Sequence, residues 1–226
     1  MKRMRLGIVA GALAVLLGAC APGWAEPSDD ATATHSFGDV ERWEKVFDDP
    51  ARASWQQPAS IVQALALAPG MVVADVGAGT GYLERMLSEV VGARGVVYAV
   101  EVEPNLVTHL RERAEREGTA NVIPVLGSTG APRLPAGRVD RILLVDTYHH
   151  INGRVDYFRR LRAALAPGGW VVVVDWEKRE DTVGPELNHR LAREQVTSEM
   201  ERAGYRPLET AVRLPHQYLL VFTPRA

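Results

Sequence analysis

Residues 72–87 read VVADVGAGTGYLERML, and this stretch decides the fold. A run over Met71–Val76 that is apolar except for Asp75 predicts a strand that is buried on both faces. Glycines at 77, 79 and 81 then permit a sharp turn and a close approach of the backbone to a ligand. Apolar residues at helical spacing predict a helix over Leu83–Val91. Strand, glycine turn and helix together form the first half of a parallel βαβ unit.

The rest of the body continues this alternation. Strands alternating with helices of this length predict an α/β fold, a doubly wound and mainly parallel seven-stranded sheet of the Rossmann-like kind. The last two strands have no helix between them, so they are expected to pair antiparallel. Strands are expected over residues 71–76, 96–100, 122–126, 141–145, 170–174, 208–214 and 218–222, and helices over 37–47, 59–67, 83–91, 106–117, 155–165 and 186–203.

The glycine turn limits the ligand that this sheet can bind. A pyrophosphate fingerprint needs its third glycine where Tyr82 stands, so the G-x-G-x-x-G pattern is missed by one position. An acid, Asp75, precedes the glycines and favours a cation. Glu101 ends the second strand, where a carboxylate can accept the hydroxyls of a ribose and repels a 2′-phosphate. These features favour a phosphate-free, positively charged adenosine compound such as S-adenosylmethionine, with a dinucleotide as the alternative.

Three stretches together resemble the class I S-adenosylmethionine-dependent methyltransferases. They are VVADVGAGTGYLERML at 72–87, GVVYAVEVEPNLV at 95–107, and LAPGGW at 165–170, which leads into the fifth strand. The similarity covers about residues 60–226, including residues 127–146 and the antiparallel last strand pair. It implies the methyltransferase fold and S-adenosylmethionine as the cofactor.

The resemblance also assigns roles to the residues around the cofactor. Asp75 would orient the loop or meet the amino acid end, and Glu101 would hold the ribose hydroxyls, with Val102 against the adenine. Many relatives carry an acid after the third strand to bind the adenine amino group, whereas this chain has Ser128. The loop glycines would wall the methionine and ribose portions: Gly77, Gly79 and Gly81.

The fourth strand delivers three candidate catalytic residues to the same edge of the sheet: Asp146, His149 and His150. Histidine titrates near neutrality, so either imidazole suits the removal of a proton from an acceptor. Asp146 would contact the cofactor or orient an imidazole. Alternatively, one histidine caps the next helix and the other packs in the interior. A metal site with Asp175 or Glu177 has no regular ligand spacing to support it, and no metal is predicted.

The first 35 residues resemble the leader of an exported bacterial lipoprotein. Three cations in Met1–Arg5 precede a fourteen-residue apolar run, Leu6–Ala19, which has the length of a signal-peptide core. Leu17-Gly18-Ala19-Cys20 is similar to a lipobox, so Cys20 is the expected lipid attachment site, although cleavage after Ala25 is an alternative. Residues 1–19 are therefore expected to be a signal peptide and residues 20–35 a flexible tether.

Composition narrows the partners further. The chain has a net charge of −2, and the three cations of Met1–Arg5 are part of that sum, so the chain without its leader is more acidic. An acidic protein repels a polyphosphate backbone, and nucleic acid is therefore not expected as a partner. A single cysteine excludes a disulfide framework. One domain is expected over residues 36–226, with residues 36–68 as an N-terminal helical flap that either shapes the pocket or packs on the core.

We expect a periplasmic, lipid-anchored enzyme that transfers a methyl group in line from S-adenosylmethionine to a small-molecule acceptor. The membrane would be met only through the anchor or the signal peptide. The alternatives are an exported non-catalytic binding protein with the same fold and a dinucleotide-dependent oxidoreductase. The expected export conflicts with the expected cofactor, because S-adenosylmethionine is made in the cytoplasm and a charged molecule of that size does not diffuse across a membrane. Either the leader does not export the domain, or the cofactor is supplied in another way, or catalysis has been lost; the intact glycine loop and Glu101 argue against the loss of catalysis.

Overall fold

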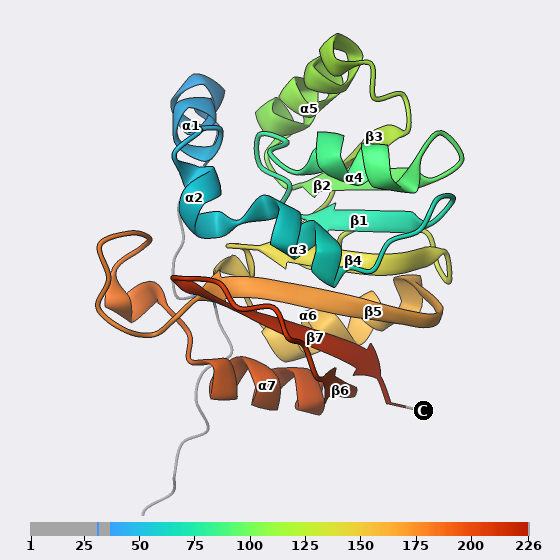
Figure 1. Ribbon diagram of the computed structural model, residues 1–226. Helices are drawn as coiled ribbons and strands as arrows, with labels where there is room; N and C mark the ends of the chain where they lie inside the picture. Colours follow the sequence, from blue (N-terminus) through green and yellow to red (C-terminus); the bar gives the residue numbers. More distant parts are fainter. Residues whose placement is uncertain (1–30, 32–36, 226) are drawn as a thin grey trace, which may run out of the picture.

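The computed structural model describes residue 31 and residues 37–225, so the expected signal peptide, Cys20 and almost all of the expected tether lie outside the described residues. Seven strands form one sheet in the order β3-β2-β1-β4-β5-β7-β6 (Figure 1). β1 to β5 run parallel, and β7 pairs antiparallel with both β5 and β6. The strands are β1 (Val72–Val76), β2 (Val96–Glu101), β3 (Val122–Leu126), β4 (Val139–Val145), β5 (Leu165–Trp176), β6 (Tyr205–Leu208) and β7 (Gln217–Pro224).

Helices cover both faces of this sheet. Ile61, Leu87 and Leu110, from α3, α4 and α5, belong to the apolar core on one face. Phe158 and Met200, from α6 and α7, belong to the core on the other. The α-helices are α1 (Val40–Phe47), α2 (Arg52–Gln56), α3 (Pro58–Ala64), α4 (Glu84–Val91), α5 (Pro104–Glu117), α6 (Arg154–Leu161) and α7 (Arg193–Arg202), with single 3₁₀ turns at η1 (Tyr148–His150), η2 (Arg162–Ala164) and η3 (Leu187–His189).

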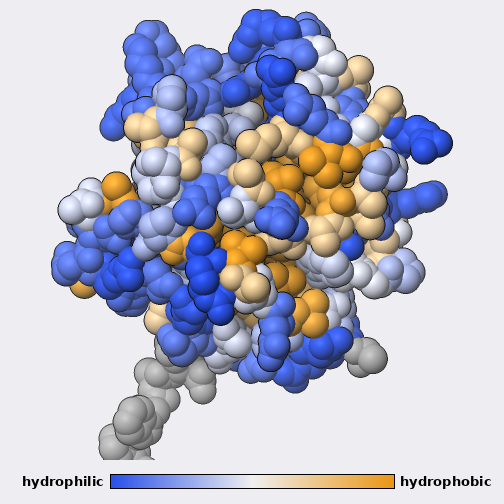
Figure 2. Space-filling model, in the orientation of Figure 1, coloured by the Kyte–Doolittle hydropathy of each residue, from blue (hydrophilic) through white to orange (hydrophobic). Residues whose placement is uncertain are grey.

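The doubly wound sheet confirms the fold expected from the sequence, with one irregular connection. The chain between β3 and β4 is a loop with turns and one isolated bridge, between Ser128 and Ala131, rather than a helix, as its glycines and prolines predict. All other parallel connections contain a helix. Viewed from the α3 and α4 side, hydrophobic residues gather near the middle of the face and charged residues surround them (Figure 2).

Two expected elements differ from the structure. The strand expected over 208–214 is wrong: β6 ends at Leu208, and Val212 and Leu214 pack on the core without pairing in the sheet. Their alternation therefore reflects packing against one face. The helix expected over 186–203 is also wrong in extent, because the chain is extended at Arg190, and α7 starts only at Arg193.

The expected flap divides into two parts. α3 is part of the main core, since Ile61 and Leu65 are fully buried. By contrast, α1 has no buried residue and α2 buries only Gln56. Below, "flap" means α1 and α2, residues 40–56. Within the described residues, no helix is both long and apolar enough to cross a membrane.

Candidate functional site

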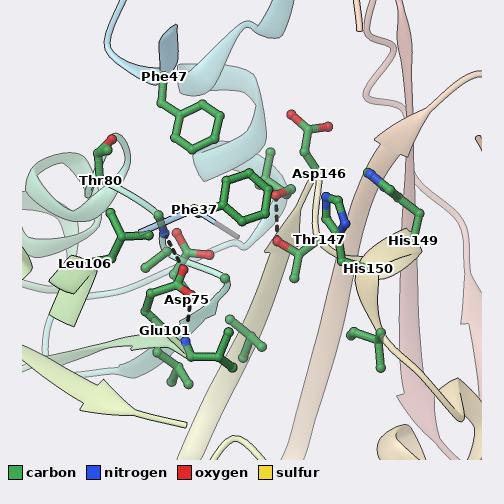
Figure 3. A pocket seen from close by; sticks show the side chains of 18 of the residues that line it. Phe37, Phe47, Asp75, Thr80, Glu101, Leu106, Asp146, Thr147, His149 and His150 are labelled. Carbon is green, nitrogen blue, oxygen red and sulfur yellow. Dashed lines mark hydrogen bonds between the residues drawn. The ribbon is translucent and has the colours of Figure 1, made fainter. Parts of the chain in front are cut away.

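A cavity of about 560 Å³ lies at the carboxyl ends of β1, β2, β4 and β5 and is partly covered by the flap. The strand order reverses between β1 and β4, which is the place where open parallel sheets bind ligands. The volume is that of an ordinary small-molecule site. Figure 3 shows residues from the glycine loop, β2, the chain after β4 and the flap meeting around this space.

The glycine loop needs glycine at two places for different reasons. Gly77 has φ +82°, and a Cβ there would lie 2.2 Å from Oγ1 of Thr147, so the loop packs directly on the chain after β4. Gly79 has φ +58° and a Cβ there would touch only the Phe47 ring at 3.4 Å. Gly77 and Gly79 line the cavity.

Gly81 has a different role from the one expected. It does not line the cavity. A Cβ at Gly81 would lie 3.0 Å from Leu110 and 3.2 Å from Arg113, both on α5. The absence of a side chain therefore lets α5 pack closely against the loop, and Gly81 supports the cofactor loop from behind.

Glu101 is fixed at the end of β2 by backbone donors. Oε2 accepts the N–H of Gly79 at 3.1 Å, while Oε1 accepts those of Val102 at 2.6 Å and Glu103 at 3.3 Å. Burial raises the pKa of Glu101, and these hydrogen bonds act against that rise. Since a carboxylate offers about four acceptor positions, the group can still accept from a ligand hydroxyl.

The adenine end of the expected site is less polar. Val102 lines the cavity beside Glu101 and is 47% exposed, so its side chain is available to a ring. Ser128 also lines the cavity, but its hydroxyl donates to the carbonyl of Ala131 at 3.2 Å and accepts the N–H of the same residue. Ser128 is therefore a weak substitute for the acid that many relatives carry there.

Asp75 lies beneath the glycine loop beside a second buried acid, Glu84, which was not predicted from the sequence as part of the site. Neither Asp75 Oδ1 nor Glu84 Oε1 accepts a hydrogen bond from a nitrogen or hydroxyl donor. Burial raises the pKa of both carboxyls, and the charge of Asp75 raises the pKa of Glu84 further. A proton on Glu84, donated to Asp75, satisfies both groups and lowers the pKa of Asp75 in return.

Asp146 connects the flap to the end of the sheet. Its carboxylate accepts from Arg52 at 3.3 Å and Gln56 at 3.2 Å, both on α2, and from Gln217 on β7. Burial raises the pKa of Asp146 to about 6, although the charge of Arg52 opposes the rise. Asp146 also holds φ +55°, which is costly for a residue with a side chain. The network compensates for that strain.

His149 forms a buried dyad with Asp175 at the end of β5. Its Nδ1 lies 2.8 Å and 3.0 Å from the two carboxylate oxygens, and its backbone N–H donates to the same group at 3.2 Å. Burial disfavours the protonated ring, but the charge and hydrogen bond of Asp175 outweigh burial and raise the pKa of His149. The ring lines the cavity. An imidazole held from behind by a carboxylate is the arrangement of a general base.

His150 lies beside this dyad and contacts Phe37, which precedes the flap. Its ring centroid is 4.1 Å from that of His149, and Phe37 contacts it edge-on at 5.4 Å. Both histidines line the cavity. The 3₁₀ turn of η1 places the two rings side by side, because the chain there is not extended.

A second network fastens the flap to the glycine loop. Asp48, which follows α1, accepts from Arg113 on α5 and from the Thr80 hydroxyl at 3.2 Å. Arg113 also donates to the carbonyl of Thr80 at 3.1 Å. Trp43 and Phe47 of the flap stack at 5.1 Å above the cavity. The flap is therefore held over the site at two points, by Asp48 and by Arg52.

Several of these residues were not predicted from the sequence as parts of the active site. Asp175 was considered only as a metal ligand, although its position at the end of β5 indicates the same edge of the sheet as Asp146. Arg52, Gln56 and Gln217 carry no local signal, since their partners are distant in sequence. Among the described residues, no group of three or more His, Asp, Glu or Cys side chains is arranged to hold a metal ion.

The observed cavity fits an adenosine ligand that has no pyrophosphate. A glycine cradle stands at the switch point, a buried carboxylate with spare acceptor capacity ends β2, and Asp75 brings an acid rather than an anion-binding donor to the loop. Fold and site together define a Rossmann-like nucleoside-binding domain with a candidate general base at its centre.

Comparison with known proteins narrows that class. Residues 73–169 match the family described as "Methyltransferase domain". A SAM-dependent methyltransferase of known structure from Aquifex aeolicus is 25% identical with a TM-score of 0.77, over 84% of this chain and 98% of its own. The chain has the fold of the class I S-adenosylmethionine-dependent methyltransferases, and S-adenosylmethionine is its cofactor.

Two relatives differ in what they act on. A protein-L-isoaspartate O-methyltransferase of Aeropyrum pernix is 36% identical over 50% of this chain and 42% of its own length. A fibrillarin-like rRNA/tRNA 2′-O-methyltransferase of Pyrobaculum calidifontis is 28% identical over 67% of this chain and 65% of its own. The chain thus spans between 42% and 65% of the length of these two relatives.

Proposed function

We propose that this protein transfers the methyl group of S-adenosylmethionine to a small-molecule acceptor. The observation that carries the proposal is the joint presence of two half-sites in one cavity. The glycine loop and Glu101 form the first, and His149 with Asp175 forms the second. A non-catalytic binding protein would have no need of an oriented, buried imidazole beside the ligand.

When bound, S-adenosylmethionine supplies an electrophilic methyl group on a sulfonium. Glu101 would hold the ribose hydroxyls, and the backbone of Gly77 and Gly79 would lie against the ligand. Much of the rate of an in-line displacement comes from positioning. The remaining task is the removal of a proton from the acceptor, which the neutral form of His149 performs while Asp175 keeps its ring in place.

A small acceptor is supported by the shape and charge of the site. The flap covers part of the cavity, which reduces the room for a polymer to enter. Asp75, Glu101 and Asp146 line it against the single arginine Arg52, and such an acidic field disfavours a phosphate backbone. Two relatives are named for a protein acceptor and for an RNA acceptor, and these acceptors are not assigned to this chain.

Calorimetric titration with S-adenosylmethionine and S-adenosylhomocysteine tests the proposal. We expect both to bind, and Glu101→Ala to weaken binding about tenfold or more, as a charged hydrogen-bond acceptor is lost. Glu112→Ala, an exposed change on α5, is the control and should bind as the wild type does. Absence of binding at millimolar ligand would refute the proposal. Binding of NADH in place of S-adenosylhomocysteine would favour the oxidoreductase.

We also propose that the protein is exported and lipid-anchored through Cys20. The support is the charged start, the apolar run over residues 6–19 and the position of the single cysteine. Incorporation of labelled palmitate in the producing cell should be lost in Cys20→Ser. Retained label in that variant, or an uncleaved leader on the purified protein, would contradict the proposal.

A further inference from the structure

The half of the cavity away from Glu101 has walls of a distinct chemistry. It lies over the ends of β4 and β5 and beneath the flap, and we call it the acceptor lobe. Rings dominate its surface, and the imidazole of the His149–Asp175 dyad is among them. The residues that define the acceptor lobe are Phe37, Trp55, His149, His150, Tyr157 and Trp176.

We propose that the acceptor is an uncharged aromatic compound with a hydroxyl group, a phenol or a hydroquinone, and that His149 takes the hydroxyl proton. The proposal rests on the methyltransferase function proposed above and adds the class of substrate.

Rigid aromatic walls are the first argument. Trp176 is 5% exposed, and its ring centroid lies 5.2 Å from that of Trp55. Gly184 packs so closely that a Cβ there would lie 2.5 Å from the Trp176 ring, which fixes the wall from another side. On the flap side, Phe37 and His150 meet edge-on at 5.4 Å (Figure 3). Ring walls that are fixed in advance favour a flat aromatic ligand at low entropic cost.

Charge is the second argument. Asp75, Glu101 and Asp146 line the cavity, and Arg52 is already paired with Asp146 at 3.3 Å. This field repels a carboxylate or phosphate on the acceptor. A cationic acceptor would instead share the cavity with a sulfonium of the same sign, at a separation where like charges repel strongly. A neutral acceptor avoids both costs.

The dyad is the third argument, and it selects a hydroxyl over an amine. A neutral aromatic amine already carries its lone pair and needs no base before attack, whereas a phenol gains nucleophilicity as its O–H bond breaks. In the step we propose, the O–C bond forms while the S–C bond of the sulfonium breaks, and its electron pair stays on sulfur as the thioether. The proton passes to His149, whose charge Asp175 then stabilises.

Size is consistent with this class. One cavity of about 560 Å³ must hold both the cofactor and the acceptor, so little more than one or two rings can be accommodated in the acceptor lobe.

The test uses three probes with the same ring and tail: 4-ethylphenol, 4-ethylaniline and 4-ethylbenzoate. Each is titrated calorimetrically into the protein saturated with S-adenosylhomocysteine, which gives a readout that does not depend on turnover. We expect 4-ethylphenol to bind at least tenfold more tightly than 4-ethylbenzoate, because only the latter is charged. Trp55→Leu should weaken binding of 4-ethylphenol several-fold. Trp170→Leu, in the same fold but against Arg141 and outside the cavity, should leave it unchanged.

Transfer of labelled methyl groups completes the test. We expect 4-ethylphenol to be methylated, and His149→Asn to lower that rate at least 100-fold while 4-ethylphenol binds within about threefold of wild type. Faster methylation of 4-ethylaniline, or no binding of any of the three probes to the S-adenosylhomocysteine complex, would overturn the substrate class and leave the methyltransferase proposal standing. Failure of S-adenosylhomocysteine itself to bind would instead refute the underlying function.

Discussion

At the scale of single residues, the reactivity of the site depends on how protein charges set the protonation of His149. Asp175 and Asp146 favour the protonated ring, whereas burial and the guanidinium of Arg154 oppose it, and the net effect raises the pKa of His149. A general base acts in its neutral form. The rate should therefore increase with pH as the ring loses its proton, at a pH above the ordinary value of about 6.5.

Asp175→Asn tests this electrostatic role directly. Without the carboxylate, the pKa of His149 should fall, so the rising limb of kcat against pH should move to lower pH. The plateau should also fall about 10- to 100-fold, as the ring loses its fixed orientation. The measurement is a pH–rate profile of the two proteins with S-adenosylhomocysteine affinity as the control. An unchanged midpoint would show that Asp175 does not set the protonation of the ring.

Glu84 provides a second residue-level prediction, for stability. Burial raises the pKa of Asp75 and Glu84, so above a pH of about 4 the folded protein binds more protons than the unfolded chain. Their contribution to stability is therefore present at low pH and decreases as the pH rises through the raised values. Glu84→Gln replaces the donated proton with an amide N–H, and at pH 8 it should raise the free energy of unfolding by about 1 kcal/mol.

Urea unfolding at pH 5.5, 7 and 8.5 measures this effect. The variant should show a flatter dependence on pH than the wild type. Glu89→Gln, on the same helix but exposed and paired with Arg85, is the matched control and should keep the slope of the wild type. Equal slopes for wild type and Glu84→Gln would contradict the shared proton.

At the scale of elements, the flap is attached mainly by polar contacts. α1 has no buried residue, and its connection to the glycine loop runs through Asp48, Arg113 and Thr80. Asp48→Ala should release this end of the flap. We expect the Kd for S-adenosylhomocysteine to increase about three- to tenfold, with a change of less than about 1 kcal/mol in the free energy of unfolding.

Hydrogen exchange of α1 in the cofactor complex reports the same release. Protection of α1 should fall in Asp48→Ala and remain in Glu41→Ala, which removes an exposed ion pair with Lys45 on the same helix. Unchanged protection and unchanged affinity would mean that Asp48 does not hold the flap.

Another element-level network supports the turn that carries the histidines. Arg154 on α6 is fully buried and bonds Glu199 on α7 through two nitrogens, at 2.6 and 2.9 Å, and Tyr148 donates to the same carboxylate at 2.9 Å. Arg154→Met leaves Glu199 buried without its counter-charge and should destabilise the protein by about 3–5 kcal/mol. Adding Glu199→Leu should recover much of this loss. Urea unfolding measures the stability of the single variant and of the double variant. If the two were equally stable, the unpaired charge of Glu199 would not be the cause of the loss.

The elements also show what the sequence could predict. β1, the glycine loop and Glu101 were predictable, because each depends on a local pattern that the buried parallel sheet imposes on neighbouring residues. By contrast, the end of β6 and the start of α7 were not predictable from the sequence. The alternation at Val212 and Leu214 looks like a strand until the absence of a pairing partner is known. Arg190 ends a helical pattern through bonds to carbonyls of the preceding loop, which no local rule describes.

The same limit applies to the candidate site. The sequence placed Asp146 and the two histidines at the correct edge of the sheet, because strand ends are shared by all parallel strands. It did not pair His149 with Asp175, which lies 26 residues away, nor Asp146 with Gln217, 71 residues away. Such contacts depend on the register of β4, β5 and β7 and appear only once the sheet is assembled.

At the scale of the whole molecule, stability and ligand closure reside in different parts of the chain. The two apolar cores on either face of the sheet are built from α3 onward, beginning with Ile61, and neither contains a residue of α1 or α2. The flap nevertheless supplies Trp43, Phe47, Arg52 and Trp55 to the cavity. The flap therefore serves the ligand rather than the core.

Removal of everything before Pro58 separates these roles. The fragment 58–226 keeps both cores, so it should unfold cooperatively with urea and retain the circular dichroism of an α/β protein. The fragment lacks Arg52 and Gln56, so only one of the three side chains that donate to Asp146 remains, that of Gln217. The fragment also lacks the aromatic side chains of the flap that cover the cavity. We expect affinity for S-adenosylhomocysteine to fall at least tenfold and methyl transfer to become undetectable. A fragment that is folded and still transfers methyl groups at the rate of the full chain would show that the flap has no part in the site.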